Sequence, residues 1–281
     1  MTSRRDLLVD ASSLASELAG DRPPVVIDVR WSLAGPPGIL AYRAGHLPGA
    51  RFVDLDTELS GRRGAGGRHP LPAVSDFEML MRRLGVNGDS DVVVYDAADS
   101  VPASRAWWEL RYFGHTDVRV LDGGYAAWVA AGLPVSIDQP DLPLGDFIAR
   151  PGGLPMLDAD EAGAVAEHGT LIDVRVGERY RGEVEPVDVV AGRIPGAVNL
   201  PTTGNIGADG KFLDIETLAH RFESLEIAAD AQVGAYCGSG VNAAHTAFAM
   251  TLAGLPTPAL YVGSWSNWIA DGTRPVATGK P

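Results

Sequence analysis

The chain has a single cysteine, Cys237, in the segment AYCGSGVNAAHTAFAM, where a short apolar run ends in a loop of small residues. Gly238 and Gly240 let the backbone curl so that successive N–H groups point inward. A helix predicted to begin near Asn242 adds the positive end of its dipole at the same place. Such a setting stabilises a thiolate, so we expect Cys237 to act as a nucleophile.

The presence of one cysteine and scattered histidines limits the chemistry that the chain can perform. One thiol excludes an internal disulfide, a Cys-rich metal site and an internal resolving thiol. The six histidines lack the HExxH or His-x-His spacing of a metal site, so we expect no metal and no cofactor. The alternative for Cys237 is a small buried hydrophobic residue, which the strand–loop–helix setting disfavours.

Two other function classes use a cysteine loop or its scaffold. Cysteine-dependent phosphatases need an arginine six positions after the cysteine to hold the phosphoryl group, but that position is Ala243. Their loop is also one residue longer, so the sequence disfavours a phosphatase. The loop N–H groups could also hold the anionic terminal sulfur of a persulfide on Cys237, so a protein-directed sulfur carrier or binding module stays open. Turnover of small sulfur donors with cyanide or a thiol as acceptor would distinguish it from an enzyme.

An internal repeat organises the chain into two copies. Four pairs of segments recur in the same order at nearly one spacing, which indicates a duplicated domain. The pairs are VVIDVR and TLIDVR, GHLPGA and GRIPGA, DVVVYD and QVGAYC, and LDGGYAAW and YVGSWSNW. The third pair aligns Asp96 with Cys237. A carboxylate cannot carry sulfur, so we expect the first copy to be structural. We expect the substrate-binding cleft to lie between the two copies, because small-molecule sites often lie at domain interfaces.

The fold class follows from the alternation of element types. Short apolar runs such as VVVY alternate with amphipathic stretches over residues 77–84, 103–113 and 243–252. This pattern predicts an α/β fold in which each copy is a parallel sheet covered by helices on both faces. We place the first domain at residues 1–138, a Pro- and Gly-rich linker at 139–156 and the catalytic domain at 157–281.

Composition excludes several partners. The 281 residues are 46% hydrophobic and carry a net charge of −13, which repels a nucleic-acid backbone. No run of 18 apolar residues predicts a membrane-spanning helix. The start, MTSRRDLLVD, lacks the apolar core of a signal peptide. We therefore expect a cytoplasmic protein that contacts neither nucleic acid nor membrane.

The loop CGSGVNA resembles the active loop of the rhodanese superfamily, and specifically of its 3-mercaptopyruvate sulfurtransferase branch, which typically carries CGSGVTA. The segments GHLPGARFVDLD, ASRAWWELRYFGH and GRIPGAVNLP are also similar to that family, so the resemblance covers nearly the whole chain. It implies two tandem rhodanese-like domains and a sulfur carried as a persulfide on Cys237. It also implies that the substrate is bound by the loop residues Gly238, Gly240, Val241 and Asn242.

The same resemblance implies a proton relay of serine, histidine and aspartate. The matching residues are Ser239 in the loop, His69 in RHPLP and Asp56 in FVDLD. Such a relay could deprotonate Cys237 or protonate a leaving enolate. The alternative is that His69 is a loop histidine beside a proline and Ser239 a small loop residue.

The resemblance further assigns Arg179, in GERYRG, to the substrate's carboxylate, which suits the bidentate guanidinium. A second substrate arginine of the family falls on Val187 here, and Arg193 is a candidate replacement. The stretch from Gly61 to Arg68 has the composition of a solvated surface loop.

The loop residues also bear on the donor. Gly238 and Ser239 are neutral, whereas a dianion such as thiosulfate needs cations beside the cysteine. We therefore expect 3-mercaptopyruvate to be preferred, with thiosulfate as the alternative donor. The acceptor is expected to be a thiol or cyanide, and a thioredoxin-like protein is a further candidate.

Overall fold

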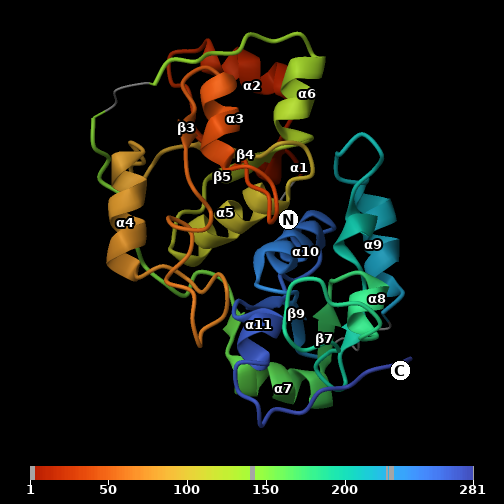
Figure 1. Cartoon of the computed structure of the whole chain (residues 1–281). Helices are drawn as coiled ribbons and strands as arrows, with labels where there is room; N and C mark the ends of the chain where they lie inside the picture. The colour runs from red at the N-terminus through yellow and green to blue at the C-terminus, as the bar shows by residue number, and fades with distance from the viewer. Residues whose placement is uncertain (1–3, 140–142, 226, 228–230, 281) are drawn as a thin grey trace. The chain divides into compact units, whose positions relative to one another are not determined.

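The computed structural model describes residues 4–139, 143–225, 227 and 231–280 (Figure 1). The chain divides into two compact units. The first comprises Met1–Gly61, Pro72–Gly153 and Ile206–Phe212, and the second comprises Arg62–Leu71, Leu154–Asn205 and Leu213–Pro281. The short segment 62–71 therefore belongs to the unit formed by the second half of the sequence. The boundaries proposed from sequence at 138 and 157 stay a prediction.

The first unit is built on a five-stranded parallel sheet in the order β1-β5-β4-β2-β3. Its strands are β1 (Leu8–Val9), β2 (Val25–Asp28), β3 (Arg51–Phe52), β4 (Val92–Tyr95) and β5 (Val118–Leu121). Its helices are α1 (Arg4–Leu7), α2 (Ala11–Leu18), α3 (Gly38–Ala44), α4 (Val74–Arg83), α5 (Val101–Tyr112) and α6 (Gly124–Ala130).

The second unit repeats this plan, with a parallel sheet in the order β6-β10-β9-β7-β8. Its strands are β6 (Met156–Leu157), β7 (Thr170–Asp173), β8 (Val198–Asn199), β9 (Val233–Tyr236) and β10 (Ala259–Tyr261). Its helices are α7 (Ala159–His168), α8 (Gly177–Tyr180), the 3₁₀ helix η1 (Thr202–Asn205), α9 (Ile215–Glu223), α10 (Val241–Leu252) and α11 (Ser264–Trp268). Each strand of one sheet has a counterpart in the other, which confirms the predicted fold class.

Both faces of each sheet are buried, which explains why the strands read as continuous apolar runs. In the first unit, Val93 and Tyr95 of β4 share a core cluster with Leu14 of α2 and Trp128 of α6. The alternating residues Val92 and Val94 are also fully buried, on the other face of the strand. In the second unit, β9 contributes to a cluster formed with α7 and α11, and α10 packs on the same sheet (Figure 1).

The Asp-x-Arg motif that recurs in the sequence performs the same structural task in both units. In the first, Arg30 pairs with Asp28 and donates to the carbonyl of Gly45 at 2.8 Å. In the second, Arg175 pairs with Asp173 and donates to the carbonyl of Gly192 at 2.7 Å. Because both side chains of each pair are buried, the motif ties the end of a central strand to the following turn.

The predicted linker is partly integrated into the first unit. Its residues 140–142 lie outside the described part of the chain. Further on, the N–H groups of Gly145, Arg150 and Gly153 donate to carbonyls of the first unit at 2.8, 2.8 and 2.9 Å. Within the described residues, every helix is too short or too polar to span a lipid bilayer.

Candidate active site

The Cys237 loop connects the end of β9 to the start of α10. The sulfur of Cys237 accepts a hydrogen bond from the N–H of Gly240 at 3.1 Å, and the residue is 3% exposed. Gly240 has a φ of 83°, a conformation that glycine adopts without strain. Because α10 begins at Val241, close to the predicted start, the sulfur lies at the positive end of a 12-residue helix.

The first residues of α11 hold the loop in this curved conformation. The N–H of Trp265 donates to the carbonyl of Cys237 at 3.0 Å, and the N–H of Ser266 donates to the carbonyl of Gly238 at 2.9 Å. The hydroxyl of Ser264 accepts from the N–H of Cys237 at 3.1 Å. These bonds satisfy main-chain groups of a buried loop and fix its shape.

The segment 62–71 is fastened to the same part of the second unit. The N–H of Arg68 donates to the Ser266 hydroxyl at 3.0 Å, and the Asn267 amide donates to the carbonyl of Ala65 at 2.7 Å. Gly67 has a φ of 109°, and a Cβ there would lie 2.8 Å from the carbonyl oxygen of Gly263. Glycine is therefore required for this close approach, which sets the position of the residues that follow it.

His69, two residues after Gly67, contacts the Cys237 loop. Its Nδ1 and the hydroxyl of Ser239 share a hydrogen bond of 2.8 Å, and both residues are 6% exposed. Two of the three predicted relay residues, 170 positions apart in the sequence, therefore lie together. A histidine that shares a hydrogen bond with a hydroxyl can pass a proton through it. Asp56 belongs to the first unit, and its part in the relay stays a prediction.

Arg179 projects from α8 into a cluster of charged groups. Glu185 binds its guanidinium through two hydrogen bonds, of 2.6 Å to Nη2 and 3.1 Å to Nε. Glu185 also accepts from the N–H groups of Val187 and Asp188, each at 3.1 Å. Burial alone would raise the pKa of Glu185, but the bonds from Arg179 and these two amides outweigh it and lower that pKa. Glu185 thereby orients Arg179 as a charged partner.

Arg68 also belongs to this cluster, although its sequence context predicted a solvated loop. That prediction is wrong for Arg68, because its side chain is only 8% exposed and forms an ion pair with Asp188. A Cβ built on Gly238 would lie 2.6 Å from Nη2 of Arg68 and 3.6 Å from Nη2 of Arg179. Both guanidiniums therefore lie against the cysteine loop. In the sequence, only the position of Arg68 directly before His69 indicates that it lies at the site.

The remaining predicted residues take different positions. Arg193 donates to the carbonyls of Tyr180 at 3.4 Å and Gly279 at 2.8 Å, and its guanidinium stacks over the Tyr180 ring at 4.4 Å. It is held as a structural residue, which argues against it as the replacement for the arginine missing at position 187. Val241 is buried, whereas Asn242 is exposed on the first turn of α10.

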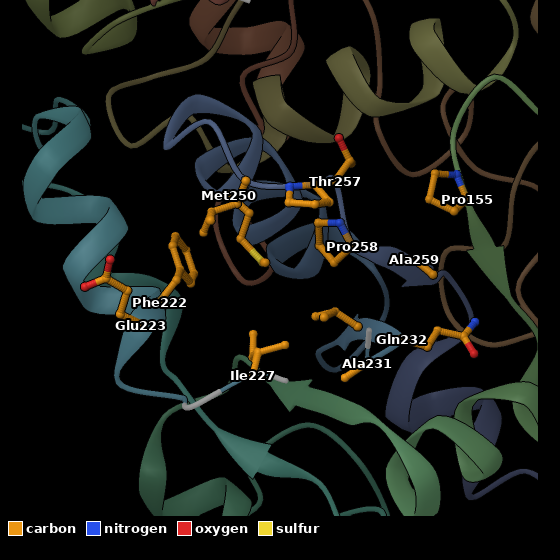
Figure 2. A pocket seen from close by; sticks show the side chains of 13 residues that line it. Pro155, Phe222, Glu223, Ile227, Ala231, Gln232, Met250, Thr257, Pro258 and Ala259 are labelled. Atoms are coloured by element: carbon orange, nitrogen blue, oxygen red, sulfur yellow. The ribbon is translucent and has the colours of Figure 1, made fainter. Parts of the chain in front are cut away.

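The second unit also contains an apolar cavity of about 510 Å³ at the opposite end of its sheet (Figure 2). Val233 and Ala259, where β9 and β10 begin, line it together with Phe222, Met250 and Pro258. Among the lining residues that are described, Glu223 is the only ionisable one. Because Cys237 follows the other end of β9, this cavity is separate from the candidate active site.

Comparisons with known proteins agree with this geometry. The model of the rhodanese-like domain matches residues 10–131 and again residues 158–271. The chain belongs to the rhodanese-like family. Each match covers four of the five strands of one sheet, β2 to β5 in the first unit and β7 to β10 in the second, so the predicted family and its tandem arrangement are confirmed.

Relatives of this rhodanese-like chain are named for two different sulfur donors, 3-mercaptopyruvate and thiosulfate. It is 45% identical to a probable 3-mercaptopyruvate sulfurtransferase of Pseudomonas aeruginosa, over 97% of this chain and 98% of the relative. It is 43% identical to a putative thiosulfate sulfurtransferase, SseB, of Mycobacterium tuberculosis, over 99% of both chains. The crystal structure of SseA from Escherichia coli, described as a 3-mercaptopyruvate sulfotransferase, matches with a TM-score of 0.81 and 32% identity, covering 92% of this chain and 98% of that one.

Proposed function

We propose that this rhodanese-like protein is a sulfurtransferase that moves a sulfane sulfur from 3-mercaptopyruvate to a thiol or cyanide through a persulfide on Cys237. The observation that carries the proposal is the position of the sulfur. It lies at the start of α10, accepts the N–H of Gly240 at 3.1 Å and shares its loop with the Ser239–His69 pair. The proposed nucleophile thus shares one loop with a side-chain pair that can exchange a proton.

In the first half-reaction, the Cys237 thiolate attacks the sulfur of 3-mercaptopyruvate. An S–S bond forms, the S–C bond of the donor breaks, and its electron pair passes to the carbon as the enolate of pyruvate. The Ser239–His69 pair transfers the proton of the donor's thiol to that carbon, which converts the enolate into pyruvate and leaves the terminal sulfur of the persulfide anionic. The loop N–H groups then stabilise the anionic terminal sulfur of the persulfide.

In the second half-reaction, a thiolate or cyanide attacks the terminal sulfur. The S–S bond breaks, its electron pair returns to Cys237 as thiolate, and the acceptor leaves as a persulfide or as thiocyanate. Because Cys237 is the only cysteine of the chain, the acceptor is another molecule.

Thiosulfate is the second candidate donor, and one observation favours it. Arg68 and Arg179 both lie against Gly238, which places more positive charge beside the cysteine than the neutral loop sequence predicts. Glu185 and Asp188 offset this charge by pairing with the two arginines. The neutralised cluster therefore still supports the donor with a single carboxylate over the dianion.

Intact-mass measurement after treatment with each donor tests the proposal. We expect one added sulfur atom on the wild-type chain with 3-mercaptopyruvate and none on Cys237→Ser. Specificity constants for 3-mercaptopyruvate and thiosulfate, measured with one acceptor at one pH, should be higher for 3-mercaptopyruvate. A higher constant for thiosulfate would reverse the donor preference, whereas sulfur transfer by Cys237→Ser would reject the persulfide mechanism.

A further inference from the structure

Two guanidiniums from distant parts of the sequence meet at Gly238, the residue after the nucleophile. Nη2 of Arg68 lies 2.6 Å, and Nη2 of Arg179 3.6 Å, from the position that a Cβ on Gly238 would occupy. Any side chain at position 238 would displace Arg68. Glycine at this position thus allows a second cation to approach the cysteine loop.

Asp188 joins the two arginines. Its carboxylate forms the ion pair with Arg68 and accepts a hydrogen bond from Nη2 of Arg179 at 3.1 Å. Its side chain is only 6% exposed. A carboxylate of the chain itself therefore occupies the position between the two guanidiniums, which is the geometry that an anionic ligand would take.

The two carboxylates of the cluster are held to different degrees. Glu185 makes two hydrogen bonds to Arg179 and accepts two backbone N–H groups, and its pKa is lowered. The pKa of Asp188 is raised, chiefly by burial and also by the nearby charge of Glu185, although Arg68 and Arg179 act against this. The charged form of Asp188 is thus poorly stabilised. Asp188 is the carboxylate that an incoming anion can replace at the lower cost.

Arg68 retains a donor for such an anion. Its Nε is buried and has no hydrogen-bond partner within the part of the chain that the structure describes. A buried N–H without a partner is costly, and a ligand oxygen would satisfy it.

We propose that Arg68 and Arg179 together bind the anionic group of the sulfur donor, and that Asp188 holds the two guanidiniums until the donor displaces it. The inference rests on the proposed function, because it assigns two further residues to the donor site of that reaction. Arg68 thereby supplies the second cation that position 187, a valine, does not. Asp188 acts as a competitor of the donor, so it sets how tightly an anion binds.

Alkylation of Cys237 by two reagents of nearly equal size tests the proposal without sulfur transfer. Iodoacetate carries a carboxylate, whereas iodoacetamide carries a neutral amide. The rate with iodoacetate divided by the rate with iodoacetamide therefore reports anion binding, because changes in the reactivity of the thiol affect both rates equally. Arg68→Ala should lower this ratio about tenfold, the effect of one charge-assisted bond. Asp188→Asn should raise it several-fold, because the competing charge is gone.

Arg181→Ala is the matched control. Arg181 lies two residues after Arg179, but its guanidinium pairs with the exposed Glu183. This variant should leave the ratio unchanged. Arg68→Gln replaces the alanine variant if the latter fails to fold as judged by circular dichroism.

Turnover provides the second measurement. Arg68→Ala should raise the KM for 3-mercaptopyruvate and for thiosulfate about tenfold while kcat changes little, because Arg68 binds the donor's anion. An unchanged alkylation ratio in the Arg68 variants would overturn the proposal. An Asp188→Asn ratio as low as that of Arg68→Ala would also overturn it, since Asp188 would then position the arginines and not compete. If the wild-type chain transfers sulfur from neither donor, the proposed function fails, and the alkylation ratio still decides whether Arg68 binds an anion.

Discussion

The loops after β4 and β9 occupy the same place in the two units, but the first carries a carboxyl group, Asp96, and the second a thiol, Cys237. In the first unit, the carboxylate of Asp96 accepts the N–H groups of Ala98, Ser100 and Ala103, each at 3.1 Å. In the second unit, the sulfur of Cys237 accepts the N–H of Gly240. One scaffold, a strand followed by a loop and a helix, thus directs backbone N–H groups at the side chain in this position, three of them at Asp96 and one at Cys237. In the first unit the chain itself fills this site permanently.

The residue before the helix also differs between the two units: it is a serine in the first and a glycine in the second. Ser100 precedes α5 with a φ of 59°, and Gly240 precedes α10 with a φ of 83°. A serine in this left-handed conformation costs roughly 1 kcal/mol, which the first unit tolerates because Asp96 accepts the N–H of Ser100. Glycine removes that cost in the second unit and leaves the N–H groups of the loop for a sulfur anion.

The largest expected effect follows from making the second loop resemble the first. Cys237→Asp should abolish sulfur transfer completely, because a carboxylate held by the loop cannot form a persulfide. The fold should persist, since Asp96 shows that such a loop accommodates a carboxylate. Intact mass and circular dichroism check both points. Asp96→Cys in a Cys237→Ser background is the converse graft, and turnover by that double variant would show that the two loops are chemically equivalent.

The second prediction concerns the residue that the segment 62–71 brings to the loop of the second unit. His69→Ala should slow turnover with 3-mercaptopyruvate by about 10²–10⁴-fold, because a proton donor to the enolate is lost. The rate of persulfide formation, followed by mass over a range of pH, checks this. His220→Ala is a control, because His220 is an exposed residue of α9. Equal rates for both variants would make His69 a structural residue of the segment.

The third prediction tests whether the charged cluster of the second unit captures the donor. Arg179→Ala should lower kcat/KM by roughly 10- to 150-fold, the effect of one lost charge-assisted bond. The variant also leaves the buried Glu185 without its main partner, so the free energy of unfolding should be measured alongside. A value of kcat/KM equal to that of Arg181→Ala would assign anion binding to another residue.

The last prediction concerns stability and the first loop. Burial, with the charge of Asp99, raises the pKa of Asp96 to about 7, although three amides act against this shift. Between the ordinary aspartate pKa near 3.8 and this value, the native state holds a proton that the unfolded state releases. The free energy of unfolding should therefore fall as pH rises through this window, by roughly 1 kcal/mol per pH unit.

Asp96→Asn cannot titrate and should lack this part of the slope. Urea unfolding at several pH values between 4 and 7 measures it, with Asp89→Asn as a control because the Asp89 side chain is 83% exposed. Identical slopes for the wild type and Asp96→Asn would show that Asp96 is charged throughout the range.

The sequence predicts most of the fold, because the repeat and the apolar runs are local patterns. It predicts the start of α10 within one residue, and it predicts correctly that both sheets are parallel. It also brings His69 to Ser239, but only through the family resemblance, because nothing local links residues 170 positions apart. Arg68 was missed for a related reason. Its surroundings are glycines and arginines typical of a solvated loop, and its burial depends on Asp188 and Gly238, far along the chain.

The assignment of segment 62–71 to the second unit has a consequence for synthesis on the ribosome. The contact between Arg68 and Ser266 spans 198 residues, so this segment emerges long before its partners exist. At about 5–20 residues per second, the wait lasts roughly 10–40 s. During that time the first half can fold around its own sheet, while the segment 62–71, which carries Arg68 and His69, lacks the residues that it contacts. Completion of the active site therefore waits until residues 264–267 have been made, and a fragment that begins after residue 71 would lack both Arg68 and His69.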